Sequence, residues 1–482
     1  MFGWEFPPHV SGGLGTACFG LTKSLVRQGV EILFVVPKLY GDEPSRRLTF
    51  INASTIKLNG QSTCKAEPGD KLPTRSLPTQ VDPSHPSQQP AQKHFPIITS
   101  KPLTYIEVPS TLLPYRSPEL NRQPTSIERW NFNPIESQGT IESSTSSFPS
   151  TQPAIQRLEQ TQDNQDETPN YYLFSGAYGP NLFHEVERYA QVAAEIAKSY
   201  TFDVIHSHDW MTFPAGIAAR EISKKPLVIH VHATEYDRSG DDVNTNIRAL
   251  ELEGMQTADR IVTVSSWTKK IVTGKFRINE AKVDVLHNGV TRVNRKKIEF
   301  KFPIKGPVIT FVGRITHQKG PLFFVEAALT VLTKIPDAHF IVVGSGDLLP
   351  LMIERVAMYR MSSHFHFTGF AKGPDIDKIW SISDVYVMPS VSEPFGITPL
   401  EAAQAGVPVI ISKQSGVAEV MPHAITVDFW NVNSLAAHIC SVLTYKSLAR
   451  TLKVNSRAHT RKLTWDRAAQ KLKTIYEQVI ST

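Results

Sequence analysis

The chain has 482 residues, of which 51 are Lys or Arg and 45 are Asp or Glu, so its formal net charge is 51 − 45 = +6. Residues 441–482 contain nine basic and two acidic side chains, so this tail alone carries 9 − 2 = +7 and the rest of the chain is close to neutral. A nucleic-acid-binding protein usually has a basic face through its body, because phosphate neutralisation supplies most of its affinity. The charge distribution therefore argues against nucleic acid as a partner.

At roughly 100 to 200 residues per domain, this length predicts two or three domains. No apolar run approaches the roughly 18 to 20 residues that a membrane helix needs, so no transmembrane segment is expected. The N-terminal segment has neither a basic n-region nor an apolar h-region, which argues against a signal peptide. Three cysteines, Cys18, Cys64 and Cys440, are too few and too scattered for a disulfide framework or a zinc site. These features predict a soluble, cytoplasmic protein.

Residues 61–170 have an unusual composition, since they contain 16 of the 34 prolines. Within them, 25 of the 50 residues from 121 to 170 are Pro, Ser, Thr or Gln. Such a composition cannot bury enough apolar surface to offset the loss of chain entropy, so we expect a largely disordered, low-complexity insertion. A short island at 95–114 has strand-forming residues between its prolines and is expected to contribute strands to the flanking domain.

The rest of the chain alternates between β-branched runs and amphipathic stretches, which predicts parallel sheets with crossover helices. We expect two doubly wound α/β domains, 1–60 with 171–295 and then 300–460, joined by a linker at 291–307. The carboxyl ends of their sheets should face a common cleft. Strands are expected at 30–37, 202–207, 226–231 and 261–265 in the first domain, and at 307–314, 339–344, 365–368, 385–389 and 407–412 in the second.

The first candidate site is the glycine-rich turn around Gly12 and Gly13, which follows a short first strand expected at 2–6 and leads into a helix. Glycines at such a turn let the backbone approach a ligand, and a helix N-terminus favours anions. The spacing does not fit the dinucleotide pattern GxGxxG. A ligand-binding loop and a tight turn without a ligand therefore both remain open.

The second candidate site is the segment HSHDW, in which His206 and His208 occupy alternate positions of a strand and point to the same side. They are candidate metal ligands, sugar-binding groups or packed core residues. Because the sequence shows no cysteine or third matching ligand nearby, we predict no metal. His208 with Trp210 could contact a sugar, and a satisfied polar group that closes the strand is the alternative.

Basic residues follow the strand expected at 307–314. Arg314 stands at the end of this strand, and Lys319 comes five residues later, directly before a helix. The two can converge on one anion, Arg as a planar fork and Lys as a point charge. Glycines bracket the segment, and its place at the cleft favours an anion site over a solvated surface.

Two carboxylates eight positions apart, Glu393 and Glu401, follow the strand expected at 385–389. Thr398 to Glu401 has the form of a capping box, with Thr398 as N-cap and Glu401 at N3, and Gly406 is expected to end this helix. A capping box does not explain Glu393, which lies in the preceding loop. The pair could bind the hydroxyls of a sugar nucleotide, while the free N–H groups of the helix start bind its phosphates.

Together these segments resemble the retaining glycosyltransferases of family 4 and the related glycogen, starch and sucrose-phosphate synthases. The resemblance covers residues 1–40 and about 171–482, and it implies the GT-B fold, two Rossmann-like domains facing an interdomain cleft. The matching segments are SEPFGITPLE (392–401, similar to the EX7E motif), GRITHQKG (313–320, similar to the phosphate-binding loop), SGGLGT (11–16), HSHDW (206–210), VLHNGV (285–290), GSG (344–346) and FTGF (367–370).

The resemblance implies a role for each matching residue. Arg314 and Lys319 would hold the diphosphate of a nucleotide sugar, and Glu401 would bind its ribose. Glu393 would contact the hydroxyls of the donor sugar, and His208 would lie near the reacting carbon. Further donor contacts are implied for Gly12, Gly13, Gly344, Gly346, Phe370, Gly396, Ile397 and Thr398.

The implied activity is that of a hexosyltransferase, which transfers a sugar from a nucleotide sugar to a glycan acceptor with retention of configuration. Glucose is the favoured sugar, and UDP- or ADP-glucose is the favoured donor. No metal or cofactor is required, because basic side chains and a helix start can stabilise the leaving diphosphate. Tyr236 and Asp237 are expected on the acceptor side, and Arg238 either there or in solvent. Two alternatives remain, a nucleotide-sugar epimerase on the same fold and a catalytically disabled glycan- or nucleotide-binding protein.

The basic tail overlaps a helix expected at 463–482, which the resemblance implies packs back on the N-terminal domain. We interpret most of the +7 excess as a solvated helix face, with contact to an anionic membrane surface as the minor alternative. The residues expected to form the buried face, spaced three and four apart, are Trp465, Ala468, Ala469, Leu472, Ile475, Tyr476 and Val479.

Overall fold

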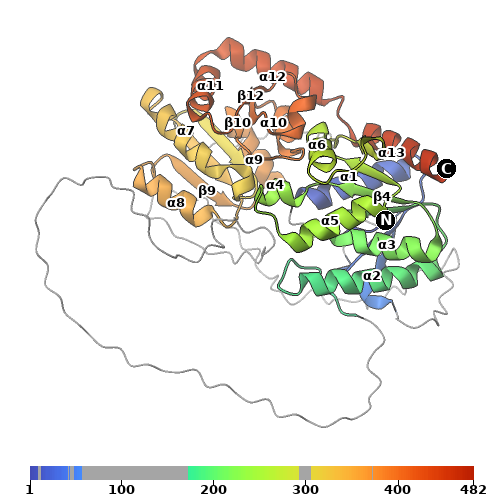
Figure 1. The fold of residues 1–482 in the computed structure, drawn as a ribbon. Helices are drawn as coiled ribbons and strands as arrows, with labels where there is room; N and C mark the ends of the chain where they lie inside the picture. Colours follow the sequence, from blue (N-terminus) through green and yellow to red (C-terminus); the bar gives the residue numbers. More distant parts are fainter. Residues whose placement is uncertain are drawn as a thin grey trace, which may run out of the picture.

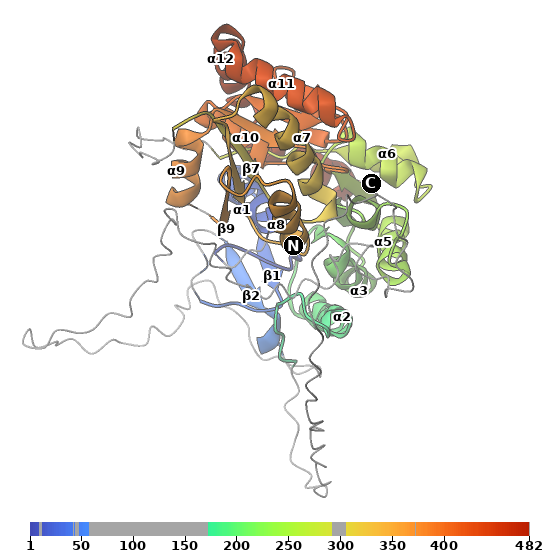
Figure 2. The same cartoon turned by 90° about the vertical axis from the view of Figure 1, so that its left-hand side faces the viewer.

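The structure is a computed structural model that describes residues 1–8, 12–41, 43, 48–56, 172–291, 305–371 and 373–481. The expected insertion at 61–170, its island at 95–114 and most of the expected linker at 291–307 lie outside the described residues. Two α/β units stand side by side in both views (Figures 1 and 2), one built mainly from residues before 291 and one from residues after 305.

The N-terminal domain is built on parallel strands. Strands β3 to β6 pair in chain order, and β1 pairs with β2. Of the residues expected as a strand at 2–6, only Phe2 and Phe6 are in β-bridges. The N–H of Phe2 donates to the carbonyl of His206 (2.8 Å), and the N–H of Gly3 donates to that of Val35 (3.0 Å), so that Phe2 bridges Val35 and Ser207. This bridge joins the two groups of strands: β1 (Leu33–Val36), β2 (Thr49–Asn52), β3 (Ile205–His208), β4 (Leu227–Val231), β5 (Arg260–Thr263) and β6 (Val283–Val285).

Helices cover both faces of this sheet (Figure 1). Odd-numbered strand residues such as Ile229 and Ile261 pack with α2 and α3, and even-numbered ones such as Val228 and Val262 pack with α1 and α13. The helical segments of this domain are α1 (Gly13–Arg27), η1 (Ala53–Thr55), α2 (Leu182–Ser199), η4 (Trp210–Thr212), α3 (Phe213–Ser223), α4 (Glu235–Ser239), α5 (Thr245–Thr257), α6 (Ser266–Gly274), η5 (Glu280–Lys282) and α13 (Trp465–Ile480).

The C-terminal domain has one six-stranded parallel sheet with the order β12-β11-β10-β7-β8-β9. The inner strands β7, β8, β10 and β11 are buried on both faces, as a sheet covered by crossover helices requires, whereas the edge strands β9 and β12 are partly exposed. The elements are β7 (Val308–Val312), η6 (His317–Lys319), α7 (Pro321–Lys334), β8 (His339–Val343), α8 (Leu349–Met358), β9 (Phe365–Gly369), α9 (Pro374–Ile382), β10 (Val385–Met388), α10 (Thr398–Ala405), β11 (Val409–Ser412), η7 (Gly416–Val420), β12 (Ile425–Val427), α11 (Val432–Thr444) and α12 (Lys446–Thr460).

The start of α10 corrects one expectation. The helix begins at Thr398 and its N-cap is Ile397, with no side-chain cap, so Thr398 and Glu401 do not form a capping box. A capping box is present instead at α4, between Thr234 and Asp237. The expected end of α10 at Gly406 is confirmed, since this residue has φ = 82° in the left-handed region that glycine favours.

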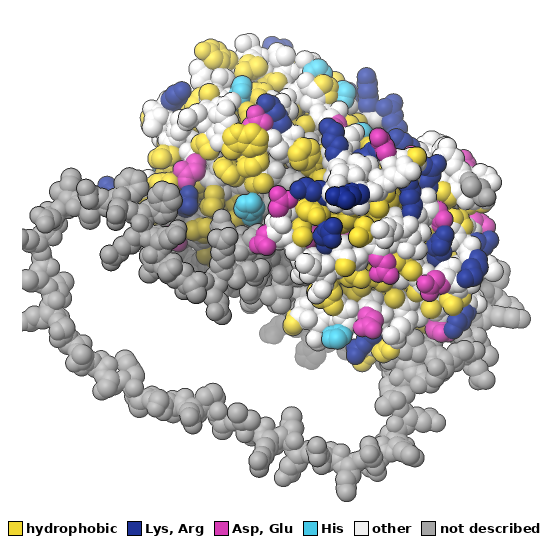
Figure 3. Space-filling model, viewed as in Figure 1, with side chains coloured by type: hydrophobic (Ala, Val, Ile, Leu, Met, Phe, Trp, Pro, Cys, Tyr) yellow, Lys and Arg dark blue, Asp and Glu magenta, His cyan; other side chains and the backbone are white. Residues whose placement is uncertain are grey.

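The basic tail is spread over α12 and α13. Six residues of α13 are buried, namely Trp465, Ala468, Ala469, Leu472, Ile475 and Tyr476, and Val479 is half-buried against the same cluster, which includes α1. Eight of the nine tail Lys and Arg are exposed and Lys473 is half-buried, and Figure 3 shows basic side chains around these two helices. Among the described residues, no helix is both long and apolar enough to cross a membrane.

Candidate functional site

The C-terminal sheet reverses its strand order beside β7. β8 and β9 continue on one side of this strand, and β10, β11 and β12 lie on the other. In such sheets the ligand crevice opens at the carboxyl ends of the strands at this switch point, here β7 and β10. The loop after β7 carries Arg314 and Lys319, and the loop after β10 carries Glu393, so the fold brings these segments to one place.

Lys319 and Glu393 meet at this switch point. The Nζ of Lys319 donates to Oε2 of Glu393 in a close ion pair, and the two side chains are only 18% and 7% exposed. The backbone of Glu393 is tied to the loop after β11, because its N–H donates to Gln414 (2.9 Å) and its carbonyl accepts from Gly416 (2.8 Å). Arg314 is half-buried in the same loop as Lys319. One acidic and one basic group are thus held rigidly at the switch point.

Glycines let the loops after β7 and β8 approach each other. A Cβ on Gly344 would lie 1.9 Å from the carbonyl oxygen of Gly313, and one on Gly346 would lie 2.3 Å from that of Ile315. Gly344 also has φ = 139°, which disfavours other residues. Phe370, after β9, is 61% exposed and lies two strands away from β7. Gly344 and Gly346 therefore have a packing role that stands whether or not they contact a ligand.

The first turn of α10 lies beside Glu393. A Cβ on Gly396 would lie 3.2 Å from Cγ of Glu393, and Gly396 has φ = 93°. Burial raises the pKa of the Tyr386 hydroxyl well above its usual value, and the charges of Glu393 and Glu401 raise it further. Both carboxylates therefore lie near Tyr386, a residue that the sequence analysis did not identify. Ile397 and Thr398, which follow Gly396, are half-buried.

The glycine turn of the N-terminal domain ends at Gly12, the N-cap of α1. A Cβ on Gly12 or Gly13 would meet nothing within 4 Å, so the backbone here is open to a neighbour. The N–H of Gly15 donates to Oε1 of Glu5 (3.0 Å), and the hydroxyl of Tyr178 donates to its other oxygen (3.3 Å). Glu5, which the sequence analysis missed, thus accepts a hydrogen bond from one of the backbone N–H groups in the first turn of α1.

Four histidines lie together at the ends of β3 and β4 and face α1 and α13. The rings of His206 and His208 stack with centroids 4.3 Å apart, and those of His230 and His232 stack at 4.2 Å. Nδ1 of His208 lies 3.0 Å from Nε2 of His232. Burial lowers the pKa of all four imidazoles, and that of His232 falls to about 3, so the cluster is neutral at physiological pH.

The prediction of no metal assumed that no cysteine and no third ligand lie near His206 and His208, and this cluster shows that such residues are present. Cys18 with His208 and His232, and separately His206 with His208 and His230, offer ligand atoms within 4.8 Å of one another. The ring orientations fit a metal poorly, however. In the group His206, His208 and His230 the ring planes are tilted by only 18° to 29°, so their in-plane lone pairs lie in nearly parallel planes and do not meet at one point. In the other group, Nδ1 of His208 and Nε2 of His232 already lie at hydrogen-bond distance (3.0 Å). The repeated pattern His-X-His at two successive strand ends is the signal that would have revealed the cluster.

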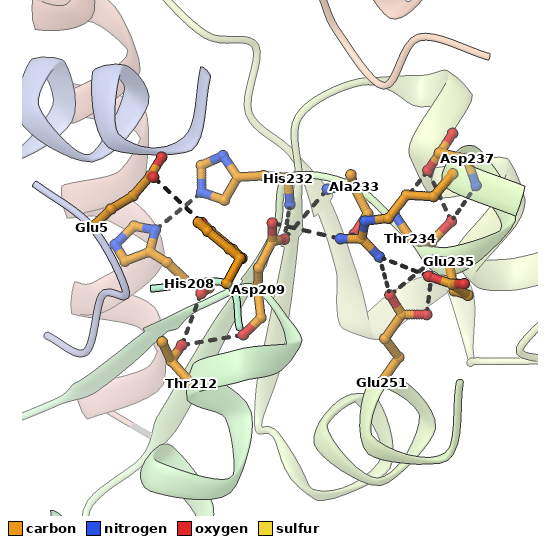
Figure 4. A network of polar contacts seen from close by, with 12 residues as sticks. Glu5, His208, Asp209, Thr212, His232, Ala233, Thr234, Glu235, Asp237 and Glu251 are labelled. Carbon is orange, nitrogen blue, oxygen red and sulfur yellow. Dashed lines mark hydrogen bonds and ion pairs between the residues drawn. The ribbon is translucent and has the colours of Figure 1, made fainter. Parts of the chain in front are cut away.

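A buried ionic network lies next to the histidines (Figure 4). The carboxylate of Asp209 accepts from the N–H of His232 (2.7 Å) and lies 3.9 Å from the guanidinium of Arg238. Arg238 also pairs with Glu251 (3.1 Å) and Glu235 (3.5 Å), and its side chain is only 4% exposed. The expectation that Arg238 is solvated is therefore wrong, because this single buried cation pairs with several buried carboxylates, and its place on the acceptor side stays a prediction.

Asp237 and Tyr236 lie on α4. Asp237 closes the capping box with Thr234, and its carboxylate accepts from the hydroxyl of Ser392 (2.6 Å) in the other domain, next to Glu393. The hydroxyl of Tyr236 accepts from Nε of Arg248 (3.0 Å). Asp237 thus forms a hydrogen bond across the domain interface, whereas Tyr236 contacts a residue of its own domain.

The segment around Glu393 is also the meeting place of the two domains. The hydroxyl of Ser265 donates to the carbonyl of Pro394 (2.5 Å), and the indole N–H of Trp267 donates to Ser392 (3.2 Å). Glu419 accepts from the N–H groups of Ser266 (2.9 Å) and Trp267 (2.7 Å) at the start of α6. These contacts between the domains therefore fix the loop that holds Glu393.

Comparison with known proteins agrees with this architecture. The model of the group 1 glycosyl transferases matches residues 294–459, and that of Glycosyltransferase Family 4 matches residues 156–292. An uncharacterized glycosyltransferase of Methanocaldococcus jannaschii is 32% identical over 295 residues, which are 57% of this chain and 75% of that protein. A glycogen synthase of Mycobacterium tuberculosis is 28% identical over 294 residues, 58% of this chain and 69% of that protein.

Two solved structures are similar in fold. Sucrose-phosphate synthase from Thermosynechococcus elongatus superposes with a TM-score of 0.55 at 22% identity, over 65% of this chain and 82% of that chain. The Anabaena protein HepE, in complex with UDP-glucose, superposes with a TM-score of 0.52 at 18% identity, over 61% and 82%. These likenesses confirm the GT-B fold with two Rossmann-like domains. The chain therefore belongs to the glycosyltransferases of group 1, in family 4.

Proposed function

We propose that this protein transfers a hexosyl group from a nucleotide sugar to a glycan acceptor with retention of configuration, and that glucose is the favoured sugar. The observation that carries the proposal is the ion pair of Lys319 and Glu393 at the switch point of the C-terminal sheet. The relatives support the substrate class, since a glycogen synthase and a structure holding UDP-glucose are among them. UDP- or ADP-glucose is the proposed donor.

The donor's diphosphate would be held by Lys319, Arg314 and the amides of Gly396, Ile397 and Thr398 at the start of α10. Breaking the glycosyl–phosphate bond leaves negative charge on the diphosphate, and fixed cations and amides in a crevice stabilise it without reorganisation. The positions of Gly344, Gly346 and Phe370 at the next strand ends suit contact with the nucleotide.

Glu393 would accept hydrogen bonds from hydroxyls of the donor sugar, and Glu401 would bind the ribose. In the absence of a donor, Lys319 keeps the Glu393 carboxylate paired, so each partner is desolvated before the substrate arrives. His208, Gly12 and Gly13 would complete the site from the N-terminal domain. The acceptor would enter between the domains near Tyr236 and Asp237, and the contact of Asp237 with Ser392 supports this assignment.

The activity is proposed for the cytoplasm. Cys18 and Cys440 are free thiols, as expected in a reducing compartment. The proposed chemistry needs no metal, because the cations of the loop after β7 supply the charge that a metal would.

The experiment is a screen of UDP-, ADP- and GDP-sugars, with and without glycan acceptors, in which nucleotide release is measured. The anomeric configuration of the product is then read by NMR. We expect release that depends on the acceptor, a retained anomer and loss of turnover in Glu393→Ala. Conversion of the donor without an acceptor would support an epimerase, and tight nucleotide binding with no turnover would support a disabled binding protein.

A further inference from the structure

We infer that His232 is a positioning residue for His208, and that it determines which ring nitrogen of His208 carries the proton. The inference rests on the proposed function, in which His208 lies beside the reacting sugar. It concerns a residue outside the segment HSHDW, on the neighbouring strand end, and it assigns to Asp209 the role of holding His232 in place.

The first support is the geometry of the contact between the two rings. Nδ1 of His208 and Nε2 of His232 are 3.0 Å apart, while the ring centroids are 5.3 Å apart. The difference of 5.3 − 3.0 = 2.3 Å is about the sum of two imidazole radii, so the two nitrogens lie near the line that joins the centroids. Each ring thus points its nitrogen at the other, as in an N–H···N hydrogen bond.

The second support is the protonation of the pair. Burial lowers the pKa of both imidazoles, so both are neutral and each carries a single N–H. One proton lies in the bridge. If it belongs to His208, the Nε2 of His208 is an acceptor; if it belongs to His232, the Nε2 of His208 is a donor. The tautomer of His232 therefore sets what His208 can offer to a sugar hydroxyl.

The third support is the free nitrogen of His208. Its Nε2 is buried and has no hydrogen-bond partner in the structure, a state that it shares with Nε2 of His206 and both nitrogens of His230, and a buried polar atom without a partner is costly. Because Nδ1 is already used by His232, Nε2 is the ring atom left for a ligand. A hydroxyl of the bound sugar would form a hydrogen bond with this nitrogen. The tautomer set by His232 would decide whether Nε2 donates or accepts in that bond.

The fourth support is the anchorage of His232. Asp209, directly after His208, has φ = 60° and ψ = 168°, a strained backbone for a residue other than glycine. Its carboxylate accepts from the N–H groups of His232 (2.7 Å) and Ala233 (3.3 Å), and Arg238 pairs with it. The same turn thus fixes both histidines relative to each other (Figure 4).

His230 provides a matched control. It lies on β4, two residues before His232, stacks on that ring, and its centroid lies 5.4 Å from that of His208. Both of its nitrogens are buried and have no partner, so it makes no hydrogen bond to His208. His230→Phe and His232→Phe both keep a ring and remove two nitrogens, and only the second breaks the bridge.

The test combines kinetics with ¹⁵N-histidine NMR of the full chain. In His232→Phe we expect kcat to fall by about 10- to 100-fold with the donor KM within about twofold, as for loss of an orienting partner. His232→Gln, whose amide can reach Nδ1 of His208, should recover most of the rate. His230→Phe should stay within about threefold of the wild type. If His232→Phe does not fold, His232→Ala replaces it, since His232 is only partly buried.

The NMR readout separates this inference from the proposed function. The wild type should show one tautomer of His208, and His232→Phe should show a mixture or the other tautomer. The pH profile should show an acid limb at higher pH in His232→Phe, because His232 is one of the neighbours that lower the pKa of His208. The titratable neighbours of His208 are Cys18, His206, the amino group of Met1, His230 and His232, and the charges of Glu5 and Asp209 act on Cys18 beside it.

An unchanged tautomer of His208 in His232→Phe would overturn the inference, as would an equal loss of kcat in His230→Phe. If the tautomer changes as expected but the wild type transfers no sugar from any donor, the proposed function fails and the positioning role stands.

Discussion

The two domains contribute to the proposed site in different ways. In the C-terminal domain the proposed site consists of short segments that directly follow single strands, and Lys319 and Glu393 meet because the sheet reverses its order there. In the N-terminal domain the proposed groups come from several elements, with His208 paired to His232, directly after β4, and Asp209 paired to Arg238 on α4. Substitutions should therefore affect binding on one side, and both stability and proton positions on the other.

The largest expected effect is on stability in the N-terminal domain. Arg238→Met leaves the buried carboxylates of Asp209, Glu235 and Glu251 without their cation, so we expect the free energy of unfolding to fall by about 3 to 5 kcal/mol. Urea denaturation measures this. Arg238→Lys, which keeps the charge but not the fork, should lose less. A loss below about 1 kcal/mol in Arg238→Met would contradict the role assigned to this network.

Glu393→Gln tests the other side of the cleft. We expect kcat/KM to fall by about 100-fold or more, because the amide cannot pair with Lys319 or accept two hydrogen bonds from the sugar. Stability should change little, since the backbone of this loop is held by other hydrogen bonds. Steady-state kinetics and thermal melting are measured together, with the exposed Glu354→Gln as control. Equal activity of the two variants would exclude Glu393 from the site.

The histidine cluster should make stability depend on pH. Its folded pKa values lie below the unfolded value of 6.5, so the unfolded chain binds more protons between these values and stability falls as the pH drops below about 6.5. Removing one such group with His230→Phe should reduce the slope of unfolding free energy by about 1.4 kcal/mol per pH unit in this range. Denaturation at a series of pH values checks this. The same slope in both proteins would mean that His230 is not buried in its neutral form.

The smallest effect is expected at the basic tail. Arg450 and Arg457 are exposed on α12, so the double variant Arg450→Ala/Arg457→Ala should change the free energy of unfolding by less than about 0.5 kcal/mol and leave activity unchanged. Co-sedimentation with anionic vesicles provides a second readout. Vesicle binding by the wild type that the variant loses would favour the membrane-surface alternative over a solvated face.

The two domains also differ in how many of their candidate site residues could be predicted from the sequence. The loops with Lys319 and Glu393 were identified because each motif is contiguous and follows one strand. The strands β2, β6 and β12 were missed because each is a short, partly exposed strand at the edge of its sheet and therefore has no continuous apolar run. The role of Arg238 was misjudged because its partners come from other parts of the chain, up to 29 residues away at Asp209, and only the fold brings them together. The same holds for the four histidines on two strands.

The most direct test of the difference between the two sides is calorimetric titration of UDP and ADP into the wild type, Lys319→Met and His208→Phe. We expect Lys319→Met to weaken nucleotide binding by about tenfold or more, and His208→Phe to bind nucleotide as the wild type does but no longer to transfer sugar. Weakening of nucleotide binding by His208→Phe to the same extent as by Lys319→Met would contradict the proposed difference between the two domains.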